Sequence, residues 1–120
     1  MATLHEVILE NGKPAFERMY GDSITDIQFY KAVFKNFRHK NGEPHGLRLT
    51  GVGNNLLKRI YDAHTYAVEG DINHLVFVQM DLHMSWPYYV GRKNATFYNT
   101  DDAAWFRLNN NDLKLYTEHL

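Results

Sequence analysis

Residues 88–98 read Tyr-Tyr-Val-Gly-Arg-Lys-Asn-Ala-Thr-Phe-Tyr, and this stretch decides the fold class. Tyr88–Val90 and Thr96–Tyr98 are aromatic and β-branched, which is typical of strands. The glycine and asparagine between them favour a turn, so the sequence predicts a β-hairpin that carries Arg92 and Lys93 at its tip. Because side chains alternate along a strand, some of these aromatic residues should point into a core and others outward.

Three segments before the hairpin carry apolar residues at spacings of three and four, which predicts amphipathic helices near 23–38, 50–64 and 72–85. The Asn-Gly-Glu-Pro sequence at 41–44 ends the first helix, and Gly46–Leu49 is long enough only for a short strand. The apolar stripe of the second helix is expected to comprise Val52, Leu56, Leu57, Ile60, Tyr61 and either His64 or Tyr66.

The third of these segments has an alternative interpretation. Val76–Val78 is β-branched and aromatic enough to be a strand, although the longer spacing from Ile72 onward favours a helix. We expect the helix, with Asp71 as its cap, and we expect Trp86 and Pro87 to end it.

The two ends of the chain complete an α+β protein. Asn11 and Gly12 favour a tight turn, so the sequence predicts an N-terminal hairpin within 1–20. The Thr-Asp-Asp run at 100–102 is expected to cap a short helix that continues to Leu108, and Asp112–His119 predicts one or two further amphipathic turns. The expected organisation is one small domain, with a hairpin at 1–20, a core at 21–98 and C-terminal helices at 99–120.

The predicted order of helix, short strand, two helices and basic-tipped hairpin resembles a winged-helix domain. Leu47–Leu57 also resembles the short strand and following helix start of winged-helix regulators, with leucine, threonine and glycine before paired leucines. The resemblance implies a winged-helix-like fold and contact with nucleic acid. The expected third helix departs from the pattern, since it offers Asn73, His74 and Gln79 but no Lys or Arg to read base edges.

Positive charge is concentrated in the middle of the chain. The formal net charge is −1, yet residues 31–59 carry seven bases against Glu43 alone, a sum of +6. This segment could bind phosphates, dock on an acidic protein surface, or be neutralised by acidic parts of its own fold. We expect a phosphate-led nucleic-acid interface of modest affinity as the leading function. Its candidate residues are Lys31, Lys35, Arg38, Lys40, Arg48, Lys58, Arg59, Arg92 and Lys93, together with Tyr88 and Tyr98 where they are exposed.

A second hypothesis comes from the overall texture of the chain. Its small size, high aromatic content and lack of cysteine resemble the small accessory proteins of tailed bacteriophages. That resemblance implies host takeover, counter-defence such as anti-CRISPR activity, or transcription control. The alternative function is therefore an inhibitor that binds a host protein, with aromatic residues of the hairpin as anchors. The near-neutral net charge favours this alternative.

Other classes of protein fit the sequence poorly. The seven histidines show no helical His-x3-His pair, and the absence of cysteine excludes disulfides and cysteine-bearing metal sites. No phosphate-binding loop, nucleophile elbow or dinucleotide motif occurs, so we expect neither an enzyme, a cofactor nor a bound metal. Polar residues interrupt the first ten positions, so we also expect no signal peptide or membrane span, and a cytoplasmic protein. The sequence does not decide the oligomeric state, and a homodimer is one of the alternatives.

Overall fold

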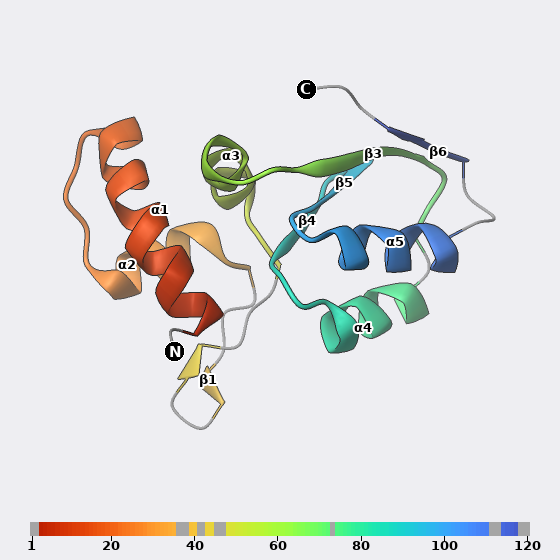
Figure 1. Ribbon diagram of the computed structural model, residues 1–120, viewed down its shortest axis with the longest axis horizontal. Coiled ribbons are helices and arrows are strands. Elements are labelled where there is room, and N and C mark those ends of the chain that lie inside the picture. Colours follow the sequence, from red (N-terminus) through yellow and green to blue (C-terminus); the bar gives the residue numbers. More distant parts are fainter. Residues whose placement is uncertain are drawn as a thin grey trace.

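The structure of the chain is a computed structural model that describes residues 3–35, 39–40, 43–44, 48–72, 74–110 and 114–117. Helices and strands mix as expected for an α+β protein (Figure 1). The elements in chain order are α1 (Leu4–Tyr20), α2 (Asp26–Val33), β1 (His39–Lys40), β2 (Glu43–Pro44), α3 (Gly51–Ile60), β3 (His64–Glu69), α4 (His74–His83), β4 (Tyr88–Val90), β5 (Asn94–Phe97), α5 (Thr100–Asn109) and β6 (Lys114–Thr117).

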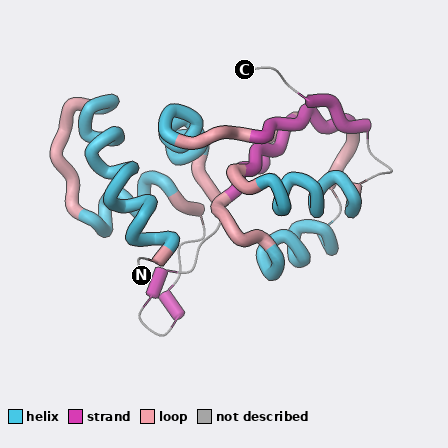
Figure 2. Tube along the Cα trace, viewed as in Figure 1, coloured by secondary structure: helices cyan, strands magenta, loops and turns pink. Residues whose placement is uncertain are grey.

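The elements gather into two packed groups, which Figure 2 shows as a set of helices beside a sheet with its own helices. The helical cluster comprises α1, α2 and α3, with Ile8, Phe29 and Leu56 fully buried among them. The sheet cluster comprises β3 to β6 with α4 and α5. Tyr98, at the end of the hairpin, packs in the helical cluster and so joins the two groups.

The first element is a helix, so the prediction of an N-terminal hairpin is wrong. A capping box begins α1, in which Thr3 accepts from the Glu6 backbone and Glu6 accepts from that of Thr3. The Asn11-Gly12 pair lies inside this helix, where it serves packing and not a turn. A Cβ at Gly12 would lie 2.9 Å from the Phe29 ring, so the glycine lets α1 approach α2 closely.

The helix predicted at 23–38 is present in shortened form as α2. It begins with a second capping box between Thr25 and Gln28 and ends at Val33. Phe34 then leaves the helix and forms an antiparallel bridge with Leu49, so the expected short strand at 46–49 is reduced, in its described part, to isolated bridges. The helix predicted at 50–64 is likewise shorter, since α3 ends at Ile60.

A threonine, Thr50, caps the N-terminus of α3. The Thr50 hydroxyl accepts from the Gly53 backbone N–H at 3.0 Å and donates to the Ala32 carbonyl oxygen at 2.6 Å. Gly53 itself lies against α2, because a Cβ there would be 2.3 Å from the Val33 carbonyl oxygen. Glycine lowers helix propensity, but a larger side chain at position 53 would collide with α2, so the contact between the two helices requires glycine there.

The sheet is antiparallel, with strand order β4-β5-β3-β6. The hairpin predicted at 88–98 is confirmed by the pairing of β4 with β5. Two predictions fail beside it: His64 and Tyr66 lie on β3 and not on the second helix, and β6 replaces the amphipathic turns expected at 112–119. Pairing partners distant in sequence stabilise both strands, which local periodicity does not reveal.

Two helices, α4 and α5, cover one face of this sheet (Figure 1). The choice of helix over strand for 72–85 is confirmed by α4. The helix begins at His74, three residues after Asp71, so Asp71 is not its cap as expected, and it ends at His83, before Trp86 and Pro87. The cap of α5 is Asn99 and not the following Thr-Asp-Asp run, and the buried Asp102 carboxylate instead accepts from the Ser85 and Trp86 backbones.

The element order departs from the winged-helix pattern at one point. Strand β3 lies between α3 and α4, where the resemblance leads us to expect two consecutive helices, and β3 pairs with the hairpin strand β5. The C-terminal short helix is confirmed as α5. In the part of the chain that the structure describes, no helix combines the length and the apolar character needed to cross a membrane.

Candidate nucleic-acid interface

A basic cavity opens on the surface between α1 and α3, and we call it the α1–α3 cavity. Its volume is about 720 Å³. The last turn of α1 contributes Arg18, Met19 and Tyr20, and α3 contributes Asn55, Lys58 and Arg59. Arg18, Tyr20, Asn55 and Arg59 are exposed and Lys58 is half-buried, so charged and aromatic groups face solvent together.

Helix termination places these side chains. Gly21 adopts φ 77°, a left-handed conformation that suits glycine, and its N–H donates to the Glu17 carbonyl oxygen. That cap ends α1 directly after Tyr20. Tyr61 ends α3 in an extended conformation one residue after Ile60, which leaves Lys58 and Arg59 in the last turn.

Each base in the cavity also has a structural explanation. Positive side chains near a helix C-terminus interact favourably with the helix dipole, by about 0.3–1 kcal/mol each. Arg18 occupies this position on α1, and Lys58 and Arg59 occupy it on α3. The dipole accounts for a base at each helix end, but it does not account for the meeting of three bases at one cavity.

The charges of the cavity are not neutralised by ion pairs within the described residues. The ion pairs found in that part of the chain are Lys13 with Asp26 and Arg48 with Asp81, and neither involves a cavity base. Glu17 and Asp62, acids close in sequence, do not line the cavity. Three bases are therefore available to an anionic ligand from solvent.

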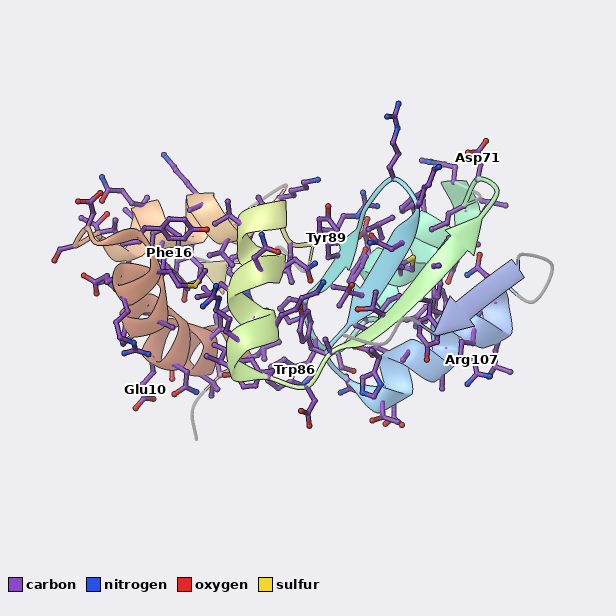
Figure 3. The ribbon with its side chains drawn as sticks, turned by 90° about the horizontal axis from the view of Figure 1, so that it is seen from above. Glu10, Phe16, Asp71, Trp86, Tyr89 and Arg107 are labelled. Atoms are coloured by element: carbon purple, nitrogen blue, oxygen red, sulfur yellow. The ribbon has the colours of Figure 1, made fainter. Side chains whose placement is uncertain are left out.

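Tyr20 gives the cavity an aromatic wall. The residue is 47% exposed, and its ring centroid lies 4.6 Å from that of Phe16 at an interplanar angle of 44°. Phe16, labelled in Figure 3, packs edge-on against the fully buried ring of Phe29. The tyrosine ring is thus held against Phe16, while Tyr20 as a residue remains exposed to solvent.

A second basic region lies along the hairpin, and we call it the hairpin groove. One cavity, of about 260 Å³, is lined by Lys35 and Arg48 among others, and a neighbouring cavity of about 300 Å³ is lined by Arg92. The two cavities share Phe77, Val90 and Gly91. The Lys35 ammonium also lies 5.9 Å from the ring centre of Tyr89.

Arg48 lines this groove, but its side chain is engaged in contacts that stabilise the fold. Its guanidinium donates to both carboxylate oxygens of Asp81 and stacks 4.9 Å from the centre of the Phe77 ring. The Tyr88 hydroxyl donates to the same carboxylate. The pKa of Tyr88 is raised mainly by burial and next by the hydrogen bond to Asp81. Burial alone would lower the pKa of Arg48, but its hydrogen bonds with Tyr88 and Asp81 raise it.

The structure sorts the residues proposed from sequence. Exposed bases are Lys31, Lys35, Arg59, Arg92 and Lys93. Lys58 joins Arg59 at the α1–α3 cavity, and Lys35 and Arg92 lie on the hairpin groove. Arg38 lies outside the described residues, and only the backbone of Lys40, in β1, is described.

Two proposed contact residues are buried, which corrects the interface predicted from sequence. Tyr88 is 0% exposed and Tyr98 is 8% exposed. The Tyr98 hydroxyl donates to the backbone and side-chain oxygens of Asn54, and burial raises the pKa of this tyrosine. Both tyrosines fill the core, as large aromatic residues of a paired hairpin often do, and neither reaches a partner in this conformation.

Sequence reasoning missed Arg18 and Tyr20. Both lie in the segment for which the sequence predicts an N-terminal hairpin, and the net charge of that segment is negative. The available signal was Gly21, which directly follows the Arg-Met-Tyr run and is typical of a helix C-cap with a base in the last turn.

The remaining chemistry is limited in the described part of the chain. No group of three or more His, Asp or Glu side chains lies close enough there to hold a metal ion. Comparisons of the chain with protein-family models, with curated proteins and with solved structures find no match. The resemblances to winged-helix domains and to bacteriophage proteins remain predictions.

Proposed function

We propose that this protein binds nucleic acid through the phosphate backbone, with the α1–α3 cavity as the principal contact. The observation that supports it is the meeting of Arg18, Lys58 and Arg59 at one solvent-facing cavity, without an ion pair for any of them among the described residues. Guanidinium groups donate paired hydrogen bonds to phosphate oxygens, and an ammonium acts as a compact positive charge.

The charge of the whole chain limits the affinity. With a net charge of −1, the protein has no general attraction for a polyanion, so binding relies on the local cluster. Contacts of this kind carry little sequence information, and non-specific complexes typically have a Kd of about 10⁻⁴ to 10⁻⁶ M at physiological salt. We expect binding in that range. The hairpin groove, with Lys35 and Arg92, would add further phosphate contacts.

A salt series tests this proposal. The anisotropy of a labelled oligonucleotide, titrated with the protein from about 20 to about 200 mM salt, gives the dependence of affinity on ionic strength. Neutralisation of three phosphates by the three cavity bases predicts a slope of log K against log salt of about −2 to −3. No binding at the lowest salt would contradict the proposal, and so would a slope close to zero.

A second candidate function, binding of a host protein, is favoured by the outer face of α4. Leu75 is 69% exposed, Val78 is 40% exposed and Leu82 is 70% exposed, and their spacing of three and four puts them on one side of the helix. Exposed apolar patches often mark protein interfaces. A partner retained by the wild-type protein from nuclease-treated bacterial lysate, and lost by Leu82→Lys, would support this function over the first. An L82K bait that retains the same partner would count against it.

A further inference from the structure

We propose that the α1–α3 cavity takes single-stranded nucleic acid, with one unpaired base stacked on the Tyr20 ring. This inference rests on the proposed function and deepens it, because it names the form of nucleic acid that the cavity accepts. The relevant feature is the aromatic side chain of the exposed residue Tyr20, which lines one cavity together with three positively charged side chains.

The Tyr20 ring is prepared for stacking. Its contact with Phe16, at a centroid distance of 4.6 Å, restricts the ring on one side, and Phe16 is in turn held against Phe29. A ring that is already oriented loses little conformational freedom when a base stacks on it. Tyr20 is also the last residue of α1, so the chain turns away at Gly21 directly after it.

Stacking distinguishes a single strand from a duplex. In a duplex each base is already stacked between its neighbours, so a protein ring gains access only to an unpaired or displaced base. A duplex would therefore offer the α1–α3 cavity its phosphates alone. A single strand would offer phosphates to Arg18, Lys58 and Arg59 and a base to Tyr20, which is the usual combination in single-strand binding proteins.

Asn55 gives the same cavity a neutral polar group. Its exposed amide has two donors and an acceptor, and it lines the cavity together with Tyr20 and Arg59. A base stacked on the tyrosine would present its edge to an amide of this kind. The arginine and lysine side chains of the cavity thus match the phosphate of an unpaired nucleotide, the tyrosine matches the face of its base, and the asparagine matches the edge of that base.

The test compares three probes with three proteins. The probes are oligothymidylate of about 12 nucleotides, an abasic sugar–phosphate strand of the same length and a blunt duplex of the same length. The proteins are the wild type, Tyr20→Phe and Tyr20→Leu. Leucine keeps an apolar contact with Phe16 but removes the ring, and equal unfolding temperatures of the three proteins establish that the fold is kept.

We expect Tyr20→Leu to weaken the binding of oligothymidylate about tenfold, which corresponds to about 1.4 kcal/mol. Y20L should leave the affinities for the abasic strand and for the duplex unchanged, and Y20F should bind all three probes as the wild type does. Wild-type affinity of Y20L for oligothymidylate would overturn the inference, as would an equal loss for all three probes, and either result leaves the proposed function standing. If the wild-type protein binds none of the probes at low salt, the proposed function and this inference both fail.

Discussion

The guanidinium of Arg48 donates two hydrogen bonds to the carboxylate of Asp81, from Nε at 3.0 Å and from Nη2 at 3.1 Å. Arg48 lies just before α3 and Asp81 lies on α4, so the pair joins the helical cluster to the sheet cluster. The fully buried Tyr88 donates its hydroxyl hydrogen to the same carboxylate. This network removes Arg48 from the set of bases available to a ligand and makes it a residue that holds the fold.

Asp81→Ala should therefore destabilise the protein by about 1–2 kcal/mol. Most of the loss comes from the buried Tyr88 hydroxyl, which is left without its acceptor, because a partly exposed ion pair contributes only about 0–1 kcal/mol. Urea unfolding measures the change. The matched control is Asp71→Ala, which removes an exposed acid from the connection between β3 and α4 (Figure 3). Equal midpoints for D81A and D71A would contradict the structural role of the network.

Two glycines of α3 should respond in opposite ways to alanine. A Cβ at Gly53 would lie 2.3 Å from the Val33 carbonyl oxygen, a backbone atom that cannot move without displacing α2, so Gly53→Ala should destabilise by about 1–3 kcal/mol. A Cβ at Gly51 would meet nothing within 4 Å, so Gly51→Ala should be neutral or stabilising by about 0.4–1 kcal/mol. Thermal unfolding of both variants gives the comparison. A G53A protein as stable as G51A would show that α2 and α3 are not in this close contact.

Burial of Tyr98 predicts a loss of stability at alkaline pH. Its pKa is raised above the ordinary value of 10.0, so the folded chain keeps the phenol neutral while the unfolded chain ionises it near that pH. The contribution to stability is therefore complete below about pH 10 and is lost as the pH rises toward the folded-state pKa. Tyr98→Phe removes this titration, although it also loses the hydrogen bond to Asn54.

The measurement is the free energy of unfolding in urea at about pH 8 and about pH 11 for the wild type and for Y98F. Y98F should start less stable and should lose less stability across this interval, by up to about 1.4 kcal/mol per pH unit above 10. Equal losses in the two proteins would mean that Tyr98 is not held neutral by the fold.

The sequence predicted those parts of the fold in which local chemistry and tertiary structure agree. Tyr88–Tyr98 has strand formers on both sides of a turn, and the α4 segment has apolar spacing long enough to outweigh its β-branched residues. The Asn11-Gly12 pair led to the wrong prediction of a turn, because this glycine is explained by the close approach of Phe29 from a neighbouring helix. Strands β3 and β6 also escaped prediction, since each is stabilised by a partner far along the chain.

The candidate site was predicted only in part, for the same physical reason. Lys58 and Arg59 stand out in a basic segment, but their partner Arg18 comes from an acidic segment that the fold of α1 brings beside α3. Charge sums along the chain do not report such a meeting. The sequence also does not reveal which tyrosines are exposed to solvent. Tyr20 and Tyr98 are the same residue type, yet Tyr20 is 47% exposed and Tyr98 is 8% exposed.

Charge reversal at two matched arginines tests the central claim most directly. Arg59→Glu and Arg107→Glu each reverse one exposed positive charge, but Arg59 lines the α1–α3 cavity and Arg107 lies on α5, at the opposite end of the molecule from α1 (Figure 3). The Kd of each variant for one labelled oligonucleotide, at one low salt concentration, is compared with that of the wild type. We predict at least about a tenfold weakening for R59E and less than about a twofold change for R107E. Equal weakening by the two variants, or wild-type affinity for R59E, would contradict the assignment of the cavity as the nucleic-acid interface.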